Sequence, residues 1–239
     1  MRRFTELFGQ TMPWRLQRRA VDGAWNETGS LPASPLQHST GTVLGGAISS
    51  GSTDFDFPKP LHTEWAWRPE PWSVSLTPPA IESFSSGASF GTQAKIFHDC
   101  SRGAYSVHQL QVVDGPAPFA VQIEAHEFDG DFLSVAIDLP ADAVTKLTRN
   151  RLLRVSAECR GERPAMYARL NLRSGPNFEH LVQRLDNGYN THLDLDLAEV
   201  NCADDCVTSA WVDVILEAPK ESRIRLDDLT FTLRPRAAF

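Results

Sequence analysis

Apolar and polar residues alternate with a period of two through most of the chain from about residue 93 onward. The clearest stretch is 119–125, where every second residue is apolar. Similar alternation recurs in the stretches 133–137, 153–159, 166–172, 193–197, 212–216 and 223–233. Because successive side chains of a strand point to opposite faces of a sheet, this pattern predicts antiparallel strands that each bury one face. The Asp-Gly-Asp at 129–131, between two of these stretches, predicts a hairpin turn.

The last stretch contains an irregularity at Asp227 and Asp228, where the apolar positions change parity. Such a change predicts a β-bulge. One of the two acids is then expected to face inward, and a buried carboxylate needs an Arg, backbone N–H groups or a cation. We expect an Arg such as Arg223 or Arg225 to fill that role.

The order of these stretches predicts the fold class. Only residues 140–151 have helical character within this region, against about nine or ten strands. We therefore expect an all-β protein, an antiparallel jelly-roll β-sandwich with a short N-terminal helical arm. The expected organisation is an amphipathic basic arm over 1–27, a Gly/Ser/Pro-rich linker or draped loop over 28–62, and the sandwich over 63–239.

The arm places aromatic and basic side chains at helical spacing, and Pro13 is positioned to open a second short helix. It either packs on the body or docks to a protein or to an anionic membrane surface. Its charge differs from that of the rest, because residues 1–30 carry five Arg against three acids.

Composition narrows the class of protein. Hydrophobic residues make up 41% and charged residues 22%, so a chain that folds in water is expected. The net charge is −7, and residues 31–239 hold 18 basic against 27 acidic side chains without a basic stripe, which argues against nucleic acid as partner. The sequence shows no signal peptide and no transmembrane segment, so we expect a cytoplasmic protein. Release inside a larger particle is the alternative.

The segment 64–72 holds three of the six tryptophans, Trp65, Trp67 and Trp72. Pro69 and Pro71 argue against a regular helix or a central strand there. We expect the segment to lie extended against the sandwich, with the indoles of Trp65 and Trp67 on one side. It is a candidate cover for a sheet face that would otherwise expose an aromatic residue.

Two resemblances are carried by particular motifs. The Trp-Val-Asp-Val-Ile-Leu-Glu at 211–217 and the Arg-Ile-Arg-Leu-Asp-Asp-Leu-Thr-Phe at 223–231 resemble the galactose-binding-like jelly rolls of carbohydrate-binding modules, over about 128–235. This resemblance implies the fold, and it only weakly implies sugar binding, since such sandwiches host many functions.

A second resemblance covers nearly the whole body after the linker. The motifs that carry it include Trp-Ala-Trp-Arg-Pro at 65–69, Phe-His-Asp-Cys at 97–100 and Ala-Arg-Leu-Asn-Leu-Arg at 168–173. They resemble an uncharacterised alphaproteobacterial family of Rhodobacter type. That resemblance implies a bacterial origin and no particular activity.

A polar sheet face is the candidate ligand-binding site. An aromatic plane can stack on a pyranose while Arg, Asn and Asp side chains bind its hydroxyls. The alternative is an ordinary solvated face with cross-strand ion pairs, for example from Arg169 to Asp213 or Glu124. The candidate residues are Tyr167, Arg169, Asn171 and Arg173 on one strand, Trp211 and Asp213 on a second, and Glu124 and His126 on a third.

Other chemistry is less well supported by the sequence. A cluster of acids invites a structural calcium, but no loop has the regular spacing of a calcium-binding loop, and we expect no cofactor. Catalysis by His98 and Cys100 lacks an oxyanion hole nearby. Cys202 and Cys206, four apart, form a local disulfide or stay unpaired, while Cys100 and Cys159 behave as small buried hydrophobes. The acids considered for calcium are Asp194, Asp196, Asp204, Asp205, Asp227 and Asp228.

The leading hypothesis is a non-catalytic binding or interaction protein with a saccharide ligand. The alternatives are a structural component that packs through the sandwich and a hydrolase acting on glycans. An exposed Trp211 on an open face favours binding, a covered face favours packing, and a groove with two carboxylates about 5–10 Å apart favours hydrolysis.

Overall fold

Two antiparallel sheets make up the part of the chain that the structure describes. The structure is a computed structural model, and it describes residues 57–83, 85–161, 164–200 and 207–236. These belong to one compact unit, Thr53–Phe239, and a second unit, Met1–Ser52, lies outside the described residues. The expected helical arm, most of the 28–62 segment and the Cys202–Cys206 pair therefore also lie outside them.

Sheet A has seven strands. Its order is β11 (Asn190–Asp196), β8 (Arg151–Arg160), β13 (Ser222–Pro235), β6 (Phe119–His126), β5 (Ala104–Gln111) and β2 (Ala80–Ser83), and β1 (Trp65–Trp67) also pairs with β13. All of these pairings are antiparallel.

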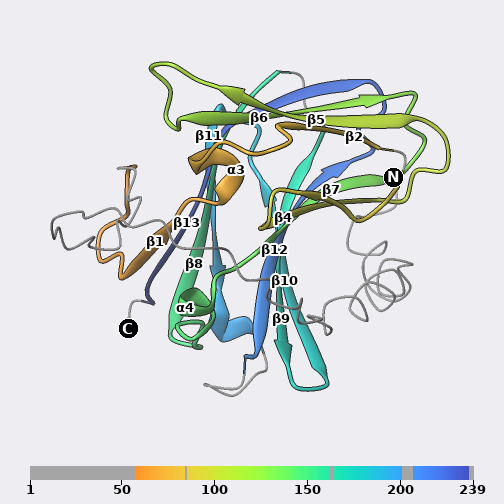
Figure 1. Ribbon diagram of the computed structural model, residues 1–239. Coiled ribbons are helices and arrows are strands. Elements are labelled where there is room, and N and C mark those ends of the chain that lie inside the picture. Colours follow the sequence, from red (N-terminus) through yellow and green to blue (C-terminus); the bar gives the residue numbers. More distant parts are fainter. Residues whose placement is uncertain (1–56, 84, 162–163, 201–206, 237–239) are drawn as a thin grey trace, which may run out of the picture. The chain divides into compact units, whose positions relative to one another are not determined.

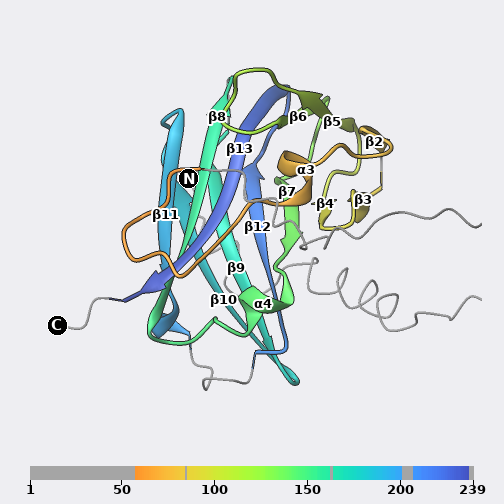
Figure 2. The ribbon, with the colours of Figure 1, turned by 60° about the vertical axis from the view of Figure 1, so that its left-hand side comes forward.

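Sheet B has six strands. Its order is β10 (Asn177–Leu185), β9 (Met166–Ser174), β12 (Ser209–Glu217), β7 (Phe132–Asp138), β4 (Ala94–His98) and β3 (Ala88–Phe90). The described helical elements are short: α3 (Glu70–Ser73), α4 (Ala141–Val144) and the 3-10 turn η1 (Leu197–Glu199). Figures 1 and 2 show both sheets, with β9 and β10 forming a long hairpin at the lower end of the view. The all-β sandwich expected from the alternation is confirmed.

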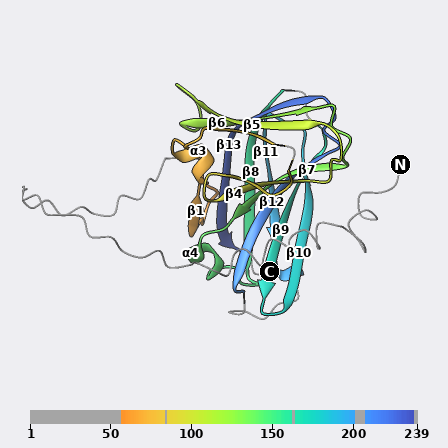
Figure 3. The ribbon, with the colours of Figure 1, turned by 45° about the vertical axis from the view of Figure 1, so that its right-hand side comes forward.

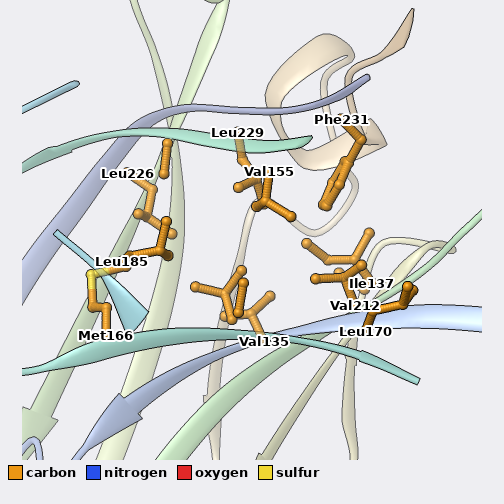
Figure 4. Packing of buried hydrophobic residues seen from close by; sticks show 14 of the residues in the cluster. Val135, Ile137, Val155, Met166, Leu170, Leu185, Val212, Leu226, Leu229 and Phe231 are labelled. Atoms are coloured by element: carbon orange, nitrogen blue, oxygen red, sulfur yellow. The ribbon is translucent and has the colours of Figure 1, made fainter. Parts of the chain in front are cut away.

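The core lies between the sheets and is built from the apolar half of each alternating strand. Val155 and Leu229 of sheet A and Leu170 and Val212 of sheet B are fully buried. Figure 4 shows these side chains meeting from the two layers. Each such aliphatic side chain stabilises the fold by about 1.5–3 kcal/mol when it leaves water. The alternation therefore stabilises the sandwich by directing one apolar face of each strand into the core.

The predicted hairpin at 129–131 is wrong. The strands on its two sides, β6 and β7, are not paired, because β6 belongs to sheet A and β7 to sheet B. The turn therefore carries the chain from one layer to the other. Gly130 suits this crossing, because a Cβ there would lie 2.5 Å from Oδ1 of Asp99 and 2.8 Å from the backbone nitrogen of Cys100.

The predicted bulge in β13 is confirmed, since the pairing of β13 with β8 shifts register between Leu226 and Asp228. The side chain of Asp227 is 1% exposed and forms ion pairs with Arg160 and, at 2.6 Å, with Arg225. Arg225 therefore fills the expected role, whereas the other acid of the bulge pairs with a more distant Arg, discussed below.

The tryptophan segment, residues 64–72, has more regular secondary structure than expected and lies beside β13 of sheet A. Trp65 pairs with Leu233 of β13 and Trp67 pairs with Phe231. The ring centroids of the two tryptophans are 6.1 Å apart. Pro71 stands in the first turn of α3, where a missing N–H costs nothing, so the expectation of a non-helical segment is wrong there. Figure 3 shows β1 and α3 beside β13. The segment thus completes sheet A and does not cover the face that carries Trp211 on sheet B.

Candidate functional site

The outer face of sheet B brings together six of the eight candidate residues. In the register of β9 and β12, Trp211 lies opposite Asn171, and Asp213 lies opposite Arg169. Tyr167 precedes Arg169 by two positions on β9 and therefore lies on the same face. The apolar neighbours on these strands, such as Leu170 and Val212, point the other way into the core. The alternation that builds the core therefore also fixes the polar face.

A hydrogen-bonded network occupies the centre of this face. Nε and Nη2 of Arg169 donate to Oδ2 of Asp213 at 3.1 and 2.6 Å, and Nδ2 of Asn171 donates to the same oxygen at 2.8 Å. The three residues are 6%, 2% and 3% exposed, in the order Arg169, Asp213, Asn171. The predicted cross-strand ion pair is thus present. A buried carboxylate that accepts charge-assisted bonds is held in one geometry, since either partner alone would be a costly buried charge.

The aromatic part of the face differs from the expected platform. Trp211 is only 7% exposed, whereas Phe178 of β10 is 43% exposed. The Phe178 ring meets the Trp211 ring edge-on, with centroids 6.3 Å apart and planes at 70°. The guanidinium of Arg173 lies over the Phe178 ring, 5.5 Å from its centroid. The exposed aromatic of this face is therefore Phe178, and Trp211 supports it.

Phe178 was not a candidate from the sequence. Its strand reads Asn-Phe-Glu-His-Leu-Val-Gln-Arg-Leu, with apolar residues on both faces, so it lacks the alternation that identified its neighbours. The only available signal was the short Gly-Pro connection at 175–176, directly after a recognised strand, which is typical of a hairpin.

Tyr167 closes the opposite end of the face. Its hydroxyl donates to Oε2 of Glu217 at 3.3 Å. Burial raises the pKa of Tyr167, and the negative charge of Glu217 adds to this effect. The phenol is therefore protonated at neutral pH and serves as a hydrogen-bond donor.

Glu124 and His126 do not belong to this face, which corrects the expectation of one shared surface. Both lie on β6 in sheet A. Oε1 of Glu124 pairs with Nε of Arg223 at 2.9 Å, and Nε2 of His126 lies 3.4 Å from the other carboxylate oxygen. The sequence pattern shows that a residue is polar and outward-facing, but two outward faces exist, and strand pairing decides between them.

The His98–Cys100 pair has a structural geometry. Nδ1 of His98 accepts the backbone N–H of Cys100 at 3.1 Å, and the thiol donates to Oδ1 of Asp129 at 3.0 Å. Desolvation and the neighbouring Asp129 raise the pKa of the Cys100 thiol. Nucleophilic cysteines need a lowered pKa, so this arrangement does not activate the sulfur. Cys159 is buried, as expected, and Cys100 is half-buried.

The described acids considered for calcium have Arg partners. Asp194 pairs with Arg154 at 2.8 Å and with Arg234 at 2.7 Å, and Asp196 pairs with Arg236 at 2.9 Å. Within the described ranges, no three His, Cys, Asp or Glu side chains gather as metal ligands would. Asp204 and Asp205 lie outside those ranges.

A cavity of about 580 Å³ lies away from this face, between the residues before β1 and the end of β13. The one carboxylate in its lining is Glu64, which pairs with Arg151 at 2.7 Å. Hydrolysis of glycosides needs two carboxyl groups across the bond, so this cavity does not have the expected hydrolase arrangement. None of the described helices is long and apolar enough to span a membrane.

Comparison with known proteins identifies a family. The model of the "Family of unknown function (DUF6478)" matches residues 47–239, and the chain belongs to this family. A comparison with curated proteins found no match. The resemblance to an uncharacterised family is thereby confirmed, while the Rhodobacter-type origin stays a prediction.

Several solved structures are similar to parts of this chain. The chain is similar to the enzymatically active domain of tailspike protein 4 of bacteriophage CBA120, at 8% identity and a TM-score of 0.42, over 59% of this chain and 19% of that one. It is similar to a family 11 carbohydrate-binding module from Clostridium thermocellum in complex with a mixed-linked tetrasaccharide, at 9% identity and a TM-score of 0.41, over 65% and 98% of the two chains.

A third similar structure is a xylan-binding domain from Paenibacillus barcinonensis, at 13% identity and a TM-score of 0.35, over 66% and 95% of the two chains. Carbohydrate-binding modules are therefore among the structural neighbours. At these identities and TM-scores the similarity does not transfer a ligand to this chain.

Proposed function

We propose that this member of the DUF6478 family is a non-catalytic binding protein that binds a saccharide on the outer face of sheet B, at the end of the β9–β10 hairpin. The observation that carries the proposal is the position of Phe178. Its ring is 43% exposed and is held edge-on by Trp211 on the same face as the buried network of Arg169, Asn171 and Asp213.

The geometry suits a sugar ring for a physical reason. An exposed aromatic plane covers the apolar C–H face of a pyranose, and donors beside it bind hydroxyl groups. Phe178 is fixed by Trp211 and Arg173, so little side-chain freedom is lost on binding. Trp211 and Arg169, which the sequence suggested as direct contacts, are buried and act here as the support of the platform.

Phe178→Ala tests this role. Wild-type protein is applied to a glycan array, and its best ligand is titrated calorimetrically against both proteins. We expect about a tenfold loss of affinity, which corresponds to about 1.4 kcal/mol. The matched control is Val113→Ala, which removes an apolar side chain that is 82% exposed on another loop. A wild-type protein without any glycan signal at high concentration would contradict the proposal.

One observation favours a second function, packing against another subunit. Phe178 is a large apolar side chain that stays 43% exposed on this face, and aromatic residues are enriched at protein–protein interfaces. Under this alternative Phe178 is an anchor for a protein surface. Phe178→Glu would then lower the molecular mass measured by light scattering, whereas a wild type with the mass of one chain would contradict it.

A further inference from the structure

Arg173 occupies a distinct position beside the Phe178 platform. It lies on β9 opposite Phe178 of β10 and opposite Ser209 of β12. Its guanidinium lies 5.5 Å from the Phe178 centroid, and its Nε donates to the carbonyl of Gly175 at 3.4 Å. The residue is half-buried, and its guanidinium lies over the Phe178 ring.

The charge of Arg173 is not balanced by a neighbouring acid within the described chain. Most other Arg side chains of the sandwich have one, as in Arg169 with Asp213 at 2.6 Å and Arg154 with Asp194 at 2.8 Å. Arg173 and Arg184 have no carboxylate of the described residues within ion-pairing distance. The contrast separates Arg173 from the structural ion pairs that hold the sheets together.

Arg184 extends the same positive edge. It lies on β10 opposite Tyr167, so it shares the outer face with Phe178 and Arg173. Tyr167 and Arg173 are six residues apart on β9, which corresponds to about 20 Å along a strand. The exposed His180 lies between the two ends. Two cations and a histidine therefore line the edge along β10, in a chain whose net charge is −7.

We infer that the saccharide bound at the Phe178 platform is anionic, with a carboxylate or sulfate group that pairs with Arg173, and that a longer chain continues along β10 toward Arg184. This inference rests on the proposed function. A guanidinium binds a carboxylate or sulfate through two parallel hydrogen bonds, which a neutral hydroxyl cannot match. Because the overall charge repels anions, the local attraction decides the specificity, and binding weakens as salt screens it.

The test uses the full chain and matched pairs of polymers. Polygalacturonate is compared with its fully methyl-esterified form, and dextran sulfate with dextran, by titration calorimetry at low and at high salt. We expect at least about tenfold tighter binding of one anionic polymer than of its neutral partner. The pair that shows the difference identifies the group as carboxylate or sulfate.

Arg173→Gln is the informative variant. It should lower the affinity for the preferred anionic polymer about tenfold and remove most of the salt dependence. The affinity for the neutral polymer should fall less, because there only the contact of Arg173 with the Phe178 ring is lost. Arg102→Gln is the control, because the Arg102 side chain is 88% exposed on a different loop. Its affinities should equal those of wild type, and equal melting temperatures confirm that both variants are folded.

The outcomes separate the two proposals. Equal binding of anionic and neutral polymers, lost in Phe178→Ala and unchanged in Arg173→Gln, overturns this inference and leaves the saccharide site in place. Absence of binding to all four polymers and to a glycan array overturns both. A preference for anions that Arg102→Gln weakens as much as Arg173→Gln overturns the assignment to Arg173.

Discussion

The guanidinium of Arg68 holds the carboxylate of Asp228 through two hydrogen bonds, from Nε to Oδ1 at 2.8 Å and from Nη2 to Oδ2 at 2.7 Å, across 160 positions of the sequence. Nη2 also donates to the carbonyl of Pro116 at 2.9 Å. The side chains of Arg68 and Asp228 are 3% and 10% exposed. This ion pair links the tryptophan segment to the bulge of β13.

Arg68→Ala should destabilise the protein strongly. It leaves the Asp228 carboxylate buried without its bidentate partner, and breaking a buried pair on one side costs about 3–5 kcal/mol. Urea unfolding followed by circular dichroism measures the change. Arg102→Ala is the matched control, because the Arg102 side chain is 88% exposed and lies 3.5 Å from Asp129. Equal midpoints for the two variants would show that the Arg68 contact contributes little.

The Arg169–Asp213 pair should show strong coupling. Each single variant, Arg169→Met and Asp213→Leu, removes one side of a buried ion pair and should lose about 3–5 kcal/mol. The double variant should lose less than the sum, because no charge remains. A double-mutant cycle from urea unfolding measures the coupling. Additive effects would mean that the two side chains do not depend on each other.

His98 should make the protein less stable as the pH falls from about 7. The side chain is 4% exposed, and burial lowers the pKa of His98 below its usual 6.5. The unfolded chain therefore takes up a proton at higher pH than the folded one, and stability declines as pH falls through 6.5 toward the folded pKa. Full stability from this group is present above that range.

His98→Asn isolates this contribution, because its Oδ1 can still accept the N–H of Cys100. Thermal melts between about pH 7.5 and 5.5 should show a smaller decrease for the variant than for wild type, since the usual carboxylate pKa values lie below this window. The other histidines are present in both proteins and cancel. Parallel pH profiles would contradict a lowered pKa of His98.

Trp72→Phe should cost about 1–3 kcal/mol. Trp72 is fully buried, and its Nε1 donates to the carbonyl of Leu226 at 3.0 Å, next to the bulge. Phenylalanine leaves this buried carbonyl without its donor and leaves a small void. Trp67→Phe serves as the comparison, since Trp67 is only partly buried and packs on Phe231 at 5.7 Å. A larger loss of unfolding free energy for Trp67→Phe than for Trp72→Phe, measured by chemical denaturation, would contradict the importance of the Trp72 hydrogen bond.

Local pattern predicted much of the fold because it reports what a strand must bury. The alternation at 153–159, 166–172 and 212–216 placed strands where β8, β9 and β12 lie. The change of parity at Asp227 located the bulge, because an inserted residue must reset the side-chain period. For Arg169 the pattern offered two outward-facing acids as ion-pair partners, Asp213 and Glu124, and the structure shows the pair with Asp213.

Pairing between distant strands was beyond the pattern. The turn at 129–131 looked like a hairpin, but β6 and β7 lie in different sheets, so Glu124 and His126 are on another face from Trp211. β10 has apolar residues on both faces, and Phe178 therefore gave no signal.

The sequence by itself determined that the chain forms alternating strands, where one of them bulges and which side chains point outward, because these properties depend on neighbours two positions apart. Only the tertiary structure decided which outward residues meet. Arg68 reaches Asp228, and Phe178 contacts both Trp211 and Arg173, because strand order and register bring distant segments together. That order is set by how all the apolar faces fit into one core, and no single stretch contains it.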